Sequence, residues 1–463
     1  MFTSVRTTQN ALRNKKISVR DVVSHFLTKI NEKNKDLNVF LTLNEDESYE
    51  LAKKYDGLLK ENPDQIFEKY PLLGCIVSFK DLFLTKGLRT TAGSKVLDSF
   101  IPPYSAKVVD KIKKAGAIII GKTNCDAWAH GASGENSDFG PTLNPWNKAY
   151  VPGGSSSGSA VSVAAGFNHV SFGTDTGGSI RQPANFCGIY GLKPTYGSVS
   201  RYGVIAMASS LDTVGHFGNN ISDIENVFKI SSGVDLCDAT LKDEDKKQKD
   251  NITVGIPKQY FEKGVDQVVS DKVHEAIKIF EKNNYKFKEV NLPNTKHAIS
   301  VYYIIQPAEV CSNLGRYDGI RFGNPRNSFG AEAKRRIILG NFVLSSGYYD
   351  AYYKKATQVR TLIINELDKA FDEVDLLIAP VSPSQPFKLG EKVNDPLKMY
   401  LSDVLTVPAN IAGIPGLSVP FGIHNGLSLG FQLMGPRFSE KLIFKMARDF
   451  ESFTNYKFEP PKF

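Results

Sequence analysis

The sequence has few of the residues on which disulfide-bonded and metal-stabilised proteins depend. Its 463 residues include only five cysteines, an odd number, widely spread and without a C-x-x-C pair (Cys75, Cys125, Cys187, Cys237 and Cys311). This pattern argues against a disulfide framework and a structural zinc site, and favours a reducing compartment. No apolar run approaches the roughly 18 uninterrupted residues of a membrane helix, so the sequence predicts a soluble protein without a membrane span.

Basic clusters and catalytic histidines are also lacking. The net charge is only +8, from 57 Lys and Arg against 49 Asp and Glu, and no hexamer rich in Lys and Arg indicates a nucleic-acid surface. The seven histidines are scattered and none accompanies a G-x-S-x-G turn, so a Ser-His-Asp triad is not indicated. The remaining composition is that of a globular protein with a large core.

Helical and strand patterns alternate along the chain. Apolar residues recur with a helical period over 19–33, 45–60 and 103–115, and short apolar runs typical of buried strands occupy 117–120, 376–380 and 430–434. The alternation predicts an α/β fold. Because there is no internal repeat, we expect one domain over residues 1–463. Its first part, about 1–65, is expected to be helical, and the mixed-charge run at about 240–250 is expected to be a surface loop, followed by a strand over 252–257 and a helix over 271–282.

The first twenty residues have two interpretations. They contain five basic residues and no acid, as mitochondrial targeting segments do. Apolar residues from Leu12 to Ile30 also continue a helical period, so the same segment can open the folded domain.

Residues 116–123 match the sequence of a phosphate-binding motif, but their expected secondary structure does not suit a phosphate loop. Residues 116–123, GAIIIGKT, satisfy G-x-x-x-x-G-K-[ST]. The four variable positions are themselves an apolar strand, whereas a phosphate loop needs free N–H groups between a strand and a helix. We therefore interpret Gly116 as the end of a helix and expect no nucleotide site here.

One lysine and one serine stand in chemically suggestive positions. Lys80 ends the apolar run from Cys75, so burial would lower its pKa and make it a base; the alternative is a lysine that reaches the surface beside Asp81. Ser179 follows Thr176, Gly177 and Gly178, whose backbone N–H groups can converge on a carbonyl oxygen as an oxyanion cradle. The alternative is a Gly-Gly-Ser turn without chemistry.

Three segments resemble the amidase signature family. They are GGSSSGS at 153–159, GTDTGGSIRQP at 173–183 and FCGIYGLKP at 186–194, together with PLLG at 71–74 and VSFKD at 77–81. The resemblance implies a central mixed sheet covered by helices on both faces. It also implies a Ser-Ser-Lys relay with Lys80 as base, Ser155 as bridging serine and Ser179 as nucleophile. It further predicts a cis peptide bond between Gly154 and Ser155.

Within the family, the likeness is greatest to the glutamine-hydrolysing subunits of tRNA-dependent amidotransferases. It rests on runs outside the signature, such as GKTN at 121–124, GENS at 134–137, SSGYYDAYY at 345–353 and DVLT at 403–406. The resemblance implies that Arg336 and Asp403 bind the α-carboxylate and α-ammonium of glutamine. It implies no cofactor in this chain. It also implies a partner B subunit that uses ATP and magnesium and contacts tRNA, and a small third subunit, of the F type in fungal mitochondria or the C type in bacteria.

The sequence departs from that family at several positions. The usual NMDEFAMG segment reads NCDAWAHG at 124–131, which puts Trp128 and His130 near the expected pocket wall, and Ser157 replaces a glycine. The segment at 321–329 is short for a bacterial subunit, which together with the acid-free start favours the mitochondrial matrix over a bacterial cytoplasm. Two other functions stay open: a stand-alone amidase acting on another small amide, and a catalytically silent scaffold.

Overall fold

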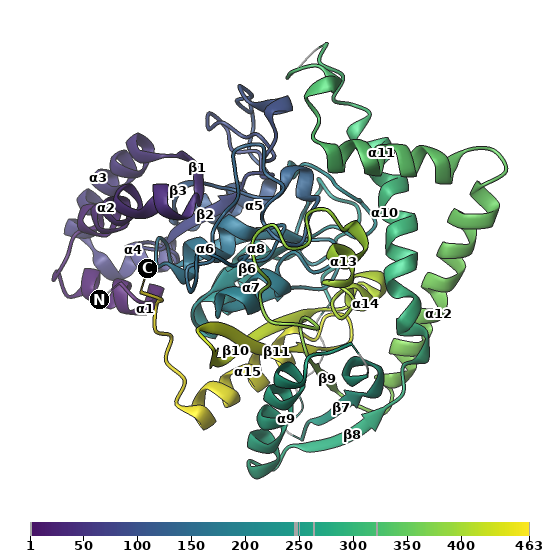
Figure 1. Ribbon diagram of the computed structural model, residues 1–463. Coiled ribbons are helices and arrows are strands. Elements are labelled where there is room, and N and C mark those ends of the chain that lie inside the picture. The colour runs from purple at the N-terminus through teal and green to yellow at the C-terminus, as the bar shows by residue number, and fades with distance from the viewer. Residues whose placement is uncertain (1, 245–248, 250, 263, 321–322, 463) are drawn as a thin grey trace.

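The computed structural model describes residues 2–244, 249, 251–262, 264–320 and 323–462 (Figure 1). Residues 245–248 and 250 of the predicted charged loop at about 240–250, and residues 321–322 of the short segment at 321–329, lie outside the described residues. Among the described residues, no helix has the length and apolar character needed to cross a membrane.

In the described part of the chain, eleven strands form one mixed sheet, in the order β1-β3-β2-β4-β6-β5-β10-β11-β9-β7-β8. Neighbouring strands are parallel on both sides of β2 and on both sides of β7, and antiparallel elsewhere. The strands are β1 Phe40–Leu43, β2 Ile76–Lys80, β3 Ile118–Thr123, β4 Val170–Asp175, β5 Tyr190–Lys193, β6 Thr213–Gly218, β7 Thr253–Pro257, β8 Lys286–Val290, β9 Leu376–Ala379, β10 Gly416–His424 and β11 Leu427–Met434.

Helices cover both faces of the sheet. They are α1 Val5–Arg13, α2 Val19–Leu37, α3 Glu45–Glu61, α4 Pro63–Lys69, α5 Lys107–Lys114, α6 Ser157–Ala164, α7 Arg181–Cys187, α8 Ile221–Ser231, α9 Gln267–Lys282, α10 Ala298–Leu314, α11 Ala331–Leu344, α12 Lys355–Ala370, α13 Pro396–Leu401, α14 Val407–Ala412 and α15 Glu440–Thr454. Alternate side chains of β9 point to opposite faces. Leu376 and Ile378 pack among α9 and α15, and Leu377 and Ala379 pack among α10, α12 and α14.

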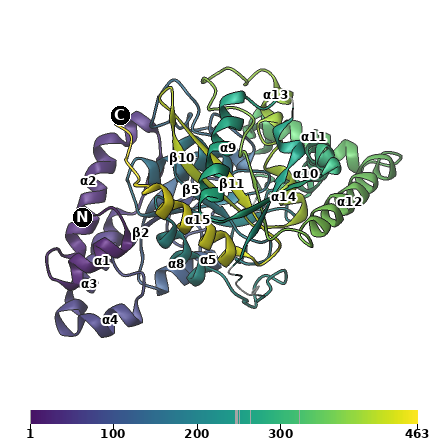
Figure 2. The ribbon, with the colours of Figure 1, turned by 90° about the horizontal axis from the view of Figure 1, so that it is seen from below.

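The figures show how distant segments meet. Helices α8 and α15 are more than 200 residues apart in the chain but lie side by side on one face (Figure 2). Helices α11 and α12 project from the body of the sheet in both views (Figures 1 and 2). The predicted α/β class, with a mixed sheet between helices, is confirmed.

Most of the predicted elements are present with shifted ends. The helix expected over 103–115 begins only at Lys107, because Pro102 and Pro103 stand in the loop before it. The strand expected over 430–434 begins at Leu427, because it pairs with β10 as a hairpin. The helical part at about 1–65 also contains a strand, β1, which pairs with β3.

The N-terminal segment is part of the folded structure. The backbone N–H of Val5 donates to Asp223, and the Thr8 hydroxyl lies 3.0 Å from Nε2 of the buried His169. Leu12 is buried with the residues of α2. The structure therefore agrees with the interpretation in which this segment begins the folded domain.

The prediction that residues 116–123 contain a strand and not a phosphate-binding loop is confirmed. Residues 118–123 form β3, whose amides pair with β2 and β1 in the sheet. Gly116 follows the end of α5 with φ of 95°, a conformation that favours glycine. Lys122 is buried, pairs with Asp81 at 3.2 Å and donates to the carbonyl of Phe83. The motif's lysine therefore has a structural role.

Candidate active site

Lys80 lies at the end of β2 with no exposed surface. Its Nζ donates to Ser155 Oγ at 2.8 Å and to Thr174 Oγ1 at 2.9 Å. Burial lowers the pKa of Lys80 to about 8, since desolvation disfavours the charged ammonium. The surface alternative is therefore wrong: Asp81 pairs with Lys122, and Lys80 faces two hydroxyl groups.

Ser155 stands just before α6, at the end of a cis peptide bond with Gly154, as predicted. Gly154 admits no side chain, because a Cβ there would lie 2.1 Å from the carboxylate of Asp126. That carboxylate accepts the N–H groups of Gly134 and Asn136. Burial raises the pKa of Asp126 to about 7. Asp126 thus holds the loop at 131–136 against the backbone that carries Ser155.

The four residues 176–179 connect β4 to α7 and have unpaired backbone donors. In the described part of the chain, the N–H groups of Thr176, Gly177, Gly178 and Ser179 donate to no protein acceptor. Ser179 is 7% exposed, and its hydroxyl makes no hydrogen bond with any described residue. A carbonyl group placed here would meet free N–H donors and a free hydroxyl, which is what an oxyanion cradle beside a nucleophile requires.

Only one of the two hydrogen bonds expected between Lys80, Ser155 and Ser179 is present in the described part of the chain. Lys80 and Ser155 are hydrogen-bonded, whereas no hydrogen bond joins the hydroxyls of Ser155 and Ser179 among the described residues. The two serines are linked through the backbone, because the N–H of Ser156 donates to the carbonyl of Ser179 at 3.3 Å.

The two glycines before Ser179 are required by their neighbours. A Cβ at Gly177 would lie 2.9 Å from the ring of Tyr302, and a Cβ at Gly178 would lie 2.3 Å from Thr406 Oγ1. The Thr406 hydroxyl also donates to the carbonyl of Gly177 at 2.7 Å. Close packing by Tyr302 of α10 and by Thr406, just before α14, thus fixes the cradle. The sequence pattern explains these two glycines only by their backbone flexibility.

A buried ion pair closes this loop. Arg181 donates to both carboxylate oxygens of Asp175 at 3.1 Å, and neither side chain is exposed. Burial alone would raise the pKa of Asp175, but Arg181 beside it lowers that pKa below its ordinary value. Arg181 further donates to the Thr406 carbonyl and to Asn410. The sequence pattern suggested no role for Arg181 or Asp175, although both stand within the signature segment.

Removing the cation of this pair is expected to destabilise the protein. Replacing Arg181 with methionine leaves Asp175 buried without a counter-ion, which typically costs about 3–5 kcal/mol of the free energy of unfolding. The matched control is Lys258→Met, which removes an exposed pair with Glu289 and should cost at most about 1 kcal/mol. Urea denaturation of the full chain measures both; equal losses would contradict a structural role for Arg181.

Asp403 lies beside the cradle. A Cβ at Gly178 would lie 3.1 Å from Asp403 Oδ1, and this buried oxygen accepts no hydrogen bond within the described residues. Burial, followed by the nearby charge of Asp175, raises the pKa of Asp403 well above its ordinary value. A cationic group of a ligand would both satisfy this oxygen and favour its ionised form.

Arg336 lines a cavity of about 190 Å³. Its Nε donates to Glu332 at 2.8 Å and its Nη1 to Gln306 at 2.9 Å, and the rings of Tyr303 and Tyr400 flank its guanidinium. The predicted cation therefore faces a cavity but already has a carboxylate partner. Glu332, which no sequence pattern singled out, holds Arg336 in place.

The two departures expected near the pocket wall have separate positions. His130 lines the cavity together with Arg336. Trp128 is not among the residues that line it: its ring packs on Tyr317 and Phe329 in a buried cluster. Trp128 has φ of 60°, which turns its side chain into that cluster.

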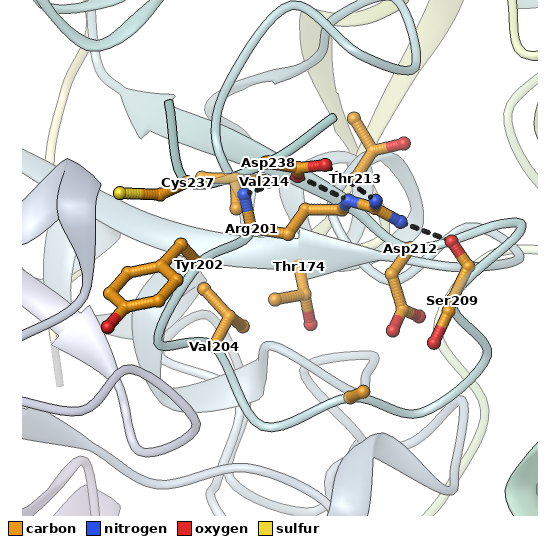
Figure 3. Close-up of a pocket in the computed structure, with 11 residues that line it drawn as sticks. Thr174, Arg201, Tyr202, Val204, Ser209, Asp212, Thr213, Val214, Cys237 and Asp238 are labelled. Carbon is orange, nitrogen blue, oxygen red and sulfur yellow. Dashed lines mark hydrogen bonds and ion pairs between the residues drawn. The ribbon is translucent and has the colours of Figure 1, made fainter. Parts of the chain in front are cut away.

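A second cavity, of about 240 Å³, is lined by residues that contact Lys80 and the cradle (Figure 3). Thr174, which accepts a hydrogen bond from Lys80, and Asp212, which accepts one from the hydroxyl of Thr176, both line it. Burial raises the pKa of Asp212 to about 6. Arg201, held by Asp238, forms another wall.

No group of three or more His, Cys, Asp or Glu residues that could hold a metal ion occurs among the residues with described positions. The groups at the site that can act on a substrate are a buried amine, two serines and a row of amide donors.

A lysine base hydrogen-bonded to a serine, next to a second serine with free amide donors, is the arrangement of a hydrolase that attacks amides through serine. The family model described as Amidase matches residues 21–444. The chain belongs to the amidase family.

Similar proteins extend over the whole chain. The A subunit of glutamyl-tRNA(Gln) amidotransferase from Carboxydothermus hydrogenoformans is 44% identical and is covered over 99% of its length, with 100% of this chain. The protein of the same name from Legionella pneumophila is 45% identical, with 99% of this chain and 98% of that protein covered. The crystal structure of the protein of this name from Thermotoga maritima has a TM-score of 0.78 and 36% identity, with 95% of each chain covered.

Proposed function

We propose that this chain is the glutamine-hydrolysing subunit of a glutamyl-tRNA(Gln) amidotransferase. The observation that carries the proposal is the likeness to subunits of that enzyme along the full length of the chain. The hydrogen bond between Lys80 and Ser155 supports hydrolysis by a serine activated by a lysine base. The hydrolysis of glutamine releases ammonia, which a partner subunit uses to convert Glu-tRNA(Gln) to Gln-tRNA(Gln).

In the proposed mechanism, the neutral amine of Lys80 starts a proton relay. Ser179 Oγ attacks the side-chain amide carbon of glutamine while its proton passes to Ser155 and the proton of Ser155 passes to Lys80. This step requires the two serine hydroxyls to come within hydrogen-bond distance when substrate binds. The N–H groups of the segment from Thr176 to Ser179 hold the oxyanion of the tetrahedral intermediate.

The intermediate collapses when the relay returns a proton to the amide nitrogen. The C–N bond breaks, ammonia leaves, and glutamate remains as an ester on Ser179. Water then attacks the ester and gives a proton to the relay, and the proton returns to Ser179 Oγ as glutamate leaves. Atoms and charges balance with these groups alone, so we propose no cofactor for this chain.

The two ends of the amino-acid substrate are proposed to bind separate charges. Asp403, next to Gly178 and without a hydrogen-bond donor in the described structure, is assigned the α-ammonium. Arg336 is assigned the α-carboxylate, although Glu332 already pairs with it. Because Glu332 offsets part of its charge, we expect Arg336 to act with a further donor from the same cavity.

The partners and the compartment are also proposals. We propose a B subunit that uses ATP and magnesium and contacts tRNA, and a small third subunit, of the F type in mitochondria or the C type in bacteria, in a heterotrimer. The proposed location is the mitochondrial matrix, supported by the basic balance of the sequence and by the shortness of the segment at 321–329, with a bacterial cytoplasm as the alternative. Fractionation of the source cells with an antibody to the chain tests the location.

Purification from the native source tests the assembly and the reaction together. The chain should copurify with two subunits identified by mass, and the complex should release glutamate from glutamine and form Gln-tRNA(Gln) with ATP. A stand-alone amidase would instead purify without such subunits and release ammonia from other small amides at least as fast. A silent scaffold would copurify but fail to react with a reagent that labels active serines.

A further inference from the structure

His130 is an unexplained polar group in the wall of the cavity that Arg336 also lines. It follows the short 3₁₀ turn at Ala127–Ala129, has no exposed surface, and lines the cavity of about 190 Å³ with Arg336. Neither of its ring nitrogens has a hydrogen-bond partner among the described residues. A buried polar group without a partner is costly, so histidine is a poor choice here unless a ligand supplies the partner.

The surroundings define what this imidazole can offer. Burial, followed by the positive charge of Arg336, lowers the pKa of His130 well below its ordinary value, so the ring is neutral at physiological pH. A neutral imidazole has one N–H donor and one nitrogen acceptor. It therefore adds a hydrogen-bond donor to the cavity without adding a second positive charge beside Arg336.

The charges around the cavity favour an anionic ligand group. Arg335, Arg336 and Lys392 line it, against Glu135 and Glu332. Glu332 pairs with both arginines, which leaves Lys392 and the Nη2 group of Arg336, for which the described residues supply no acceptor, to attract an anion. The unpartnered acid at Asp403 lies beside the cradle and is not one of the residues lining this cavity.

We propose that His130 donates a hydrogen bond to the α-carboxylate of the amino-acid substrate, next to Arg336, and so sets the requirement for that carboxylate. This inference rests on the proposed glutaminase function and adds a specificity-determining residue to it. His130 acts on binding and takes no part in the proton relay, since within the described structure it makes no hydrogen bond with Lys80 or with either relay serine.

Two amides that differ only in the α-carboxylate test the proposal. L-Glutamine has the carboxylate, and 4-aminobutanamide is the same molecule without it. His130→Met removes the donor at similar volume. In the complete enzyme complex we expect the KM for glutamine to rise about ten-fold, the size of effect of one hydrogen bond to a charged group, with kcat little changed. The kcat/KM for 4-aminobutanamide should change less than about two-fold, because that amide has no carboxylate to lose a donor.

Matched variants separate binding from folding. His130→Gln keeps an N–H donor and should restore most of the lost affinity, whereas a merely structural role would make both variants alike. His424→Met, an exposed histidine on β10, should leave both substrates unaffected. Thermal unfolding of each variant shows whether it is folded. If His130→Met is unfolded, His130→Gln is compared with the wild-type enzyme instead.

The outcomes distinguish the inference from the function on which it rests. Equal changes for the two amides, or an unchanged KM for glutamine in His130→Met, would overturn the role of His130 and leave the glutaminase proposal standing. A wild-type complex that hydrolyses no glutamine would overturn the proposed function itself.

Discussion

Replacing Ser179 with alanine is expected to lower the rate of glutamine hydrolysis by roughly four to six orders of magnitude, the loss seen when a serine nucleophile is removed elsewhere. The physical reason is that the other hydroxyls at the row of free N–H groups between β4 and α7 are already engaged in the described structure: that of Thr176 donates to Asp212, and that of Thr406 donates to the carbonyl of Gly177. Amidation of Glu-tRNA(Gln) by the same complex with added ammonium should persist, because the partner subunit needs only ammonia.

Both activities are measured on one preparation of the assembled complex, as glutamate release and as Gln-tRNA(Gln) formation. Ser345→Ala, at an exposed serine, is the matched control and should keep both. Loss of both activities in Ser179→Ala would argue against the division of labour between subunits. Retention of glutamine hydrolysis would show that Ser179 is not the nucleophile.

Replacing Lys80 with methionine is expected to be about as severe, because Ser155 then has no base to accept its proton. In the wild-type enzyme, the neutral amine is the active form. Since burial lowers the pKa of Lys80 to about 8, kcat/KM for glutamine should fall about ten-fold for each pH unit below about 8 and level off above it. Ammonia-dependent amidation should lack this dependence on Lys80.

Other groups near Lys80 also titrate, so their variants assign the pH dependence. Burial raises the pKa of Asp212 to about 6 and that of Asp126 to about 7. Both carboxylates raise the pKa of Lys80. In Asp212→Asn the falling limb should therefore remain and move slightly to lower pH. If the limb disappears in either carboxylate variant, the group that titrates is the carboxylate and not Lys80.

The sequence predicted some residues of the site but not all of the contacts between them. Lys80, Ser155 and Ser179 stand in dense local motifs, and the structure brings Lys80 to Ser155 and places Ser179 at the free amides. Local spacing is enough here because Ser155 and Ser179 flank two adjacent elements, α6 and β4. What spacing could not give is the missing hydrogen bond between the two serines, which depends on side-chain geometry.

Residues that act across the fold were harder to predict. Glu332, which holds Arg336, and Tyr302, which packs on Gly177, lie far along the chain from the signature and stand in ordinary helical sequence. Trp128 is expected near the pocket wall because its segment departs from the family pattern, but it has a positive φ and its ring packs in a buried aromatic cluster. Neighbours in sequence can thus face opposite sides of one turn.

The α/β class and the strand at the phosphate-like motif could be read from the sequence, because alternating apolar periods are local signals. The three proposed relay residues came from the resemblance of short glycine-serine segments to a known family. Three features of the site depend on the folded chain: Lys80 is fully buried and donates to Ser155 and Thr174, Arg181 closes the loop through Asp175, and His130 has no hydrogen-bond partner in the described part of the chain. Burial and the pairing of charges depend on which distant segments pack together, and that is a property of the folded chain.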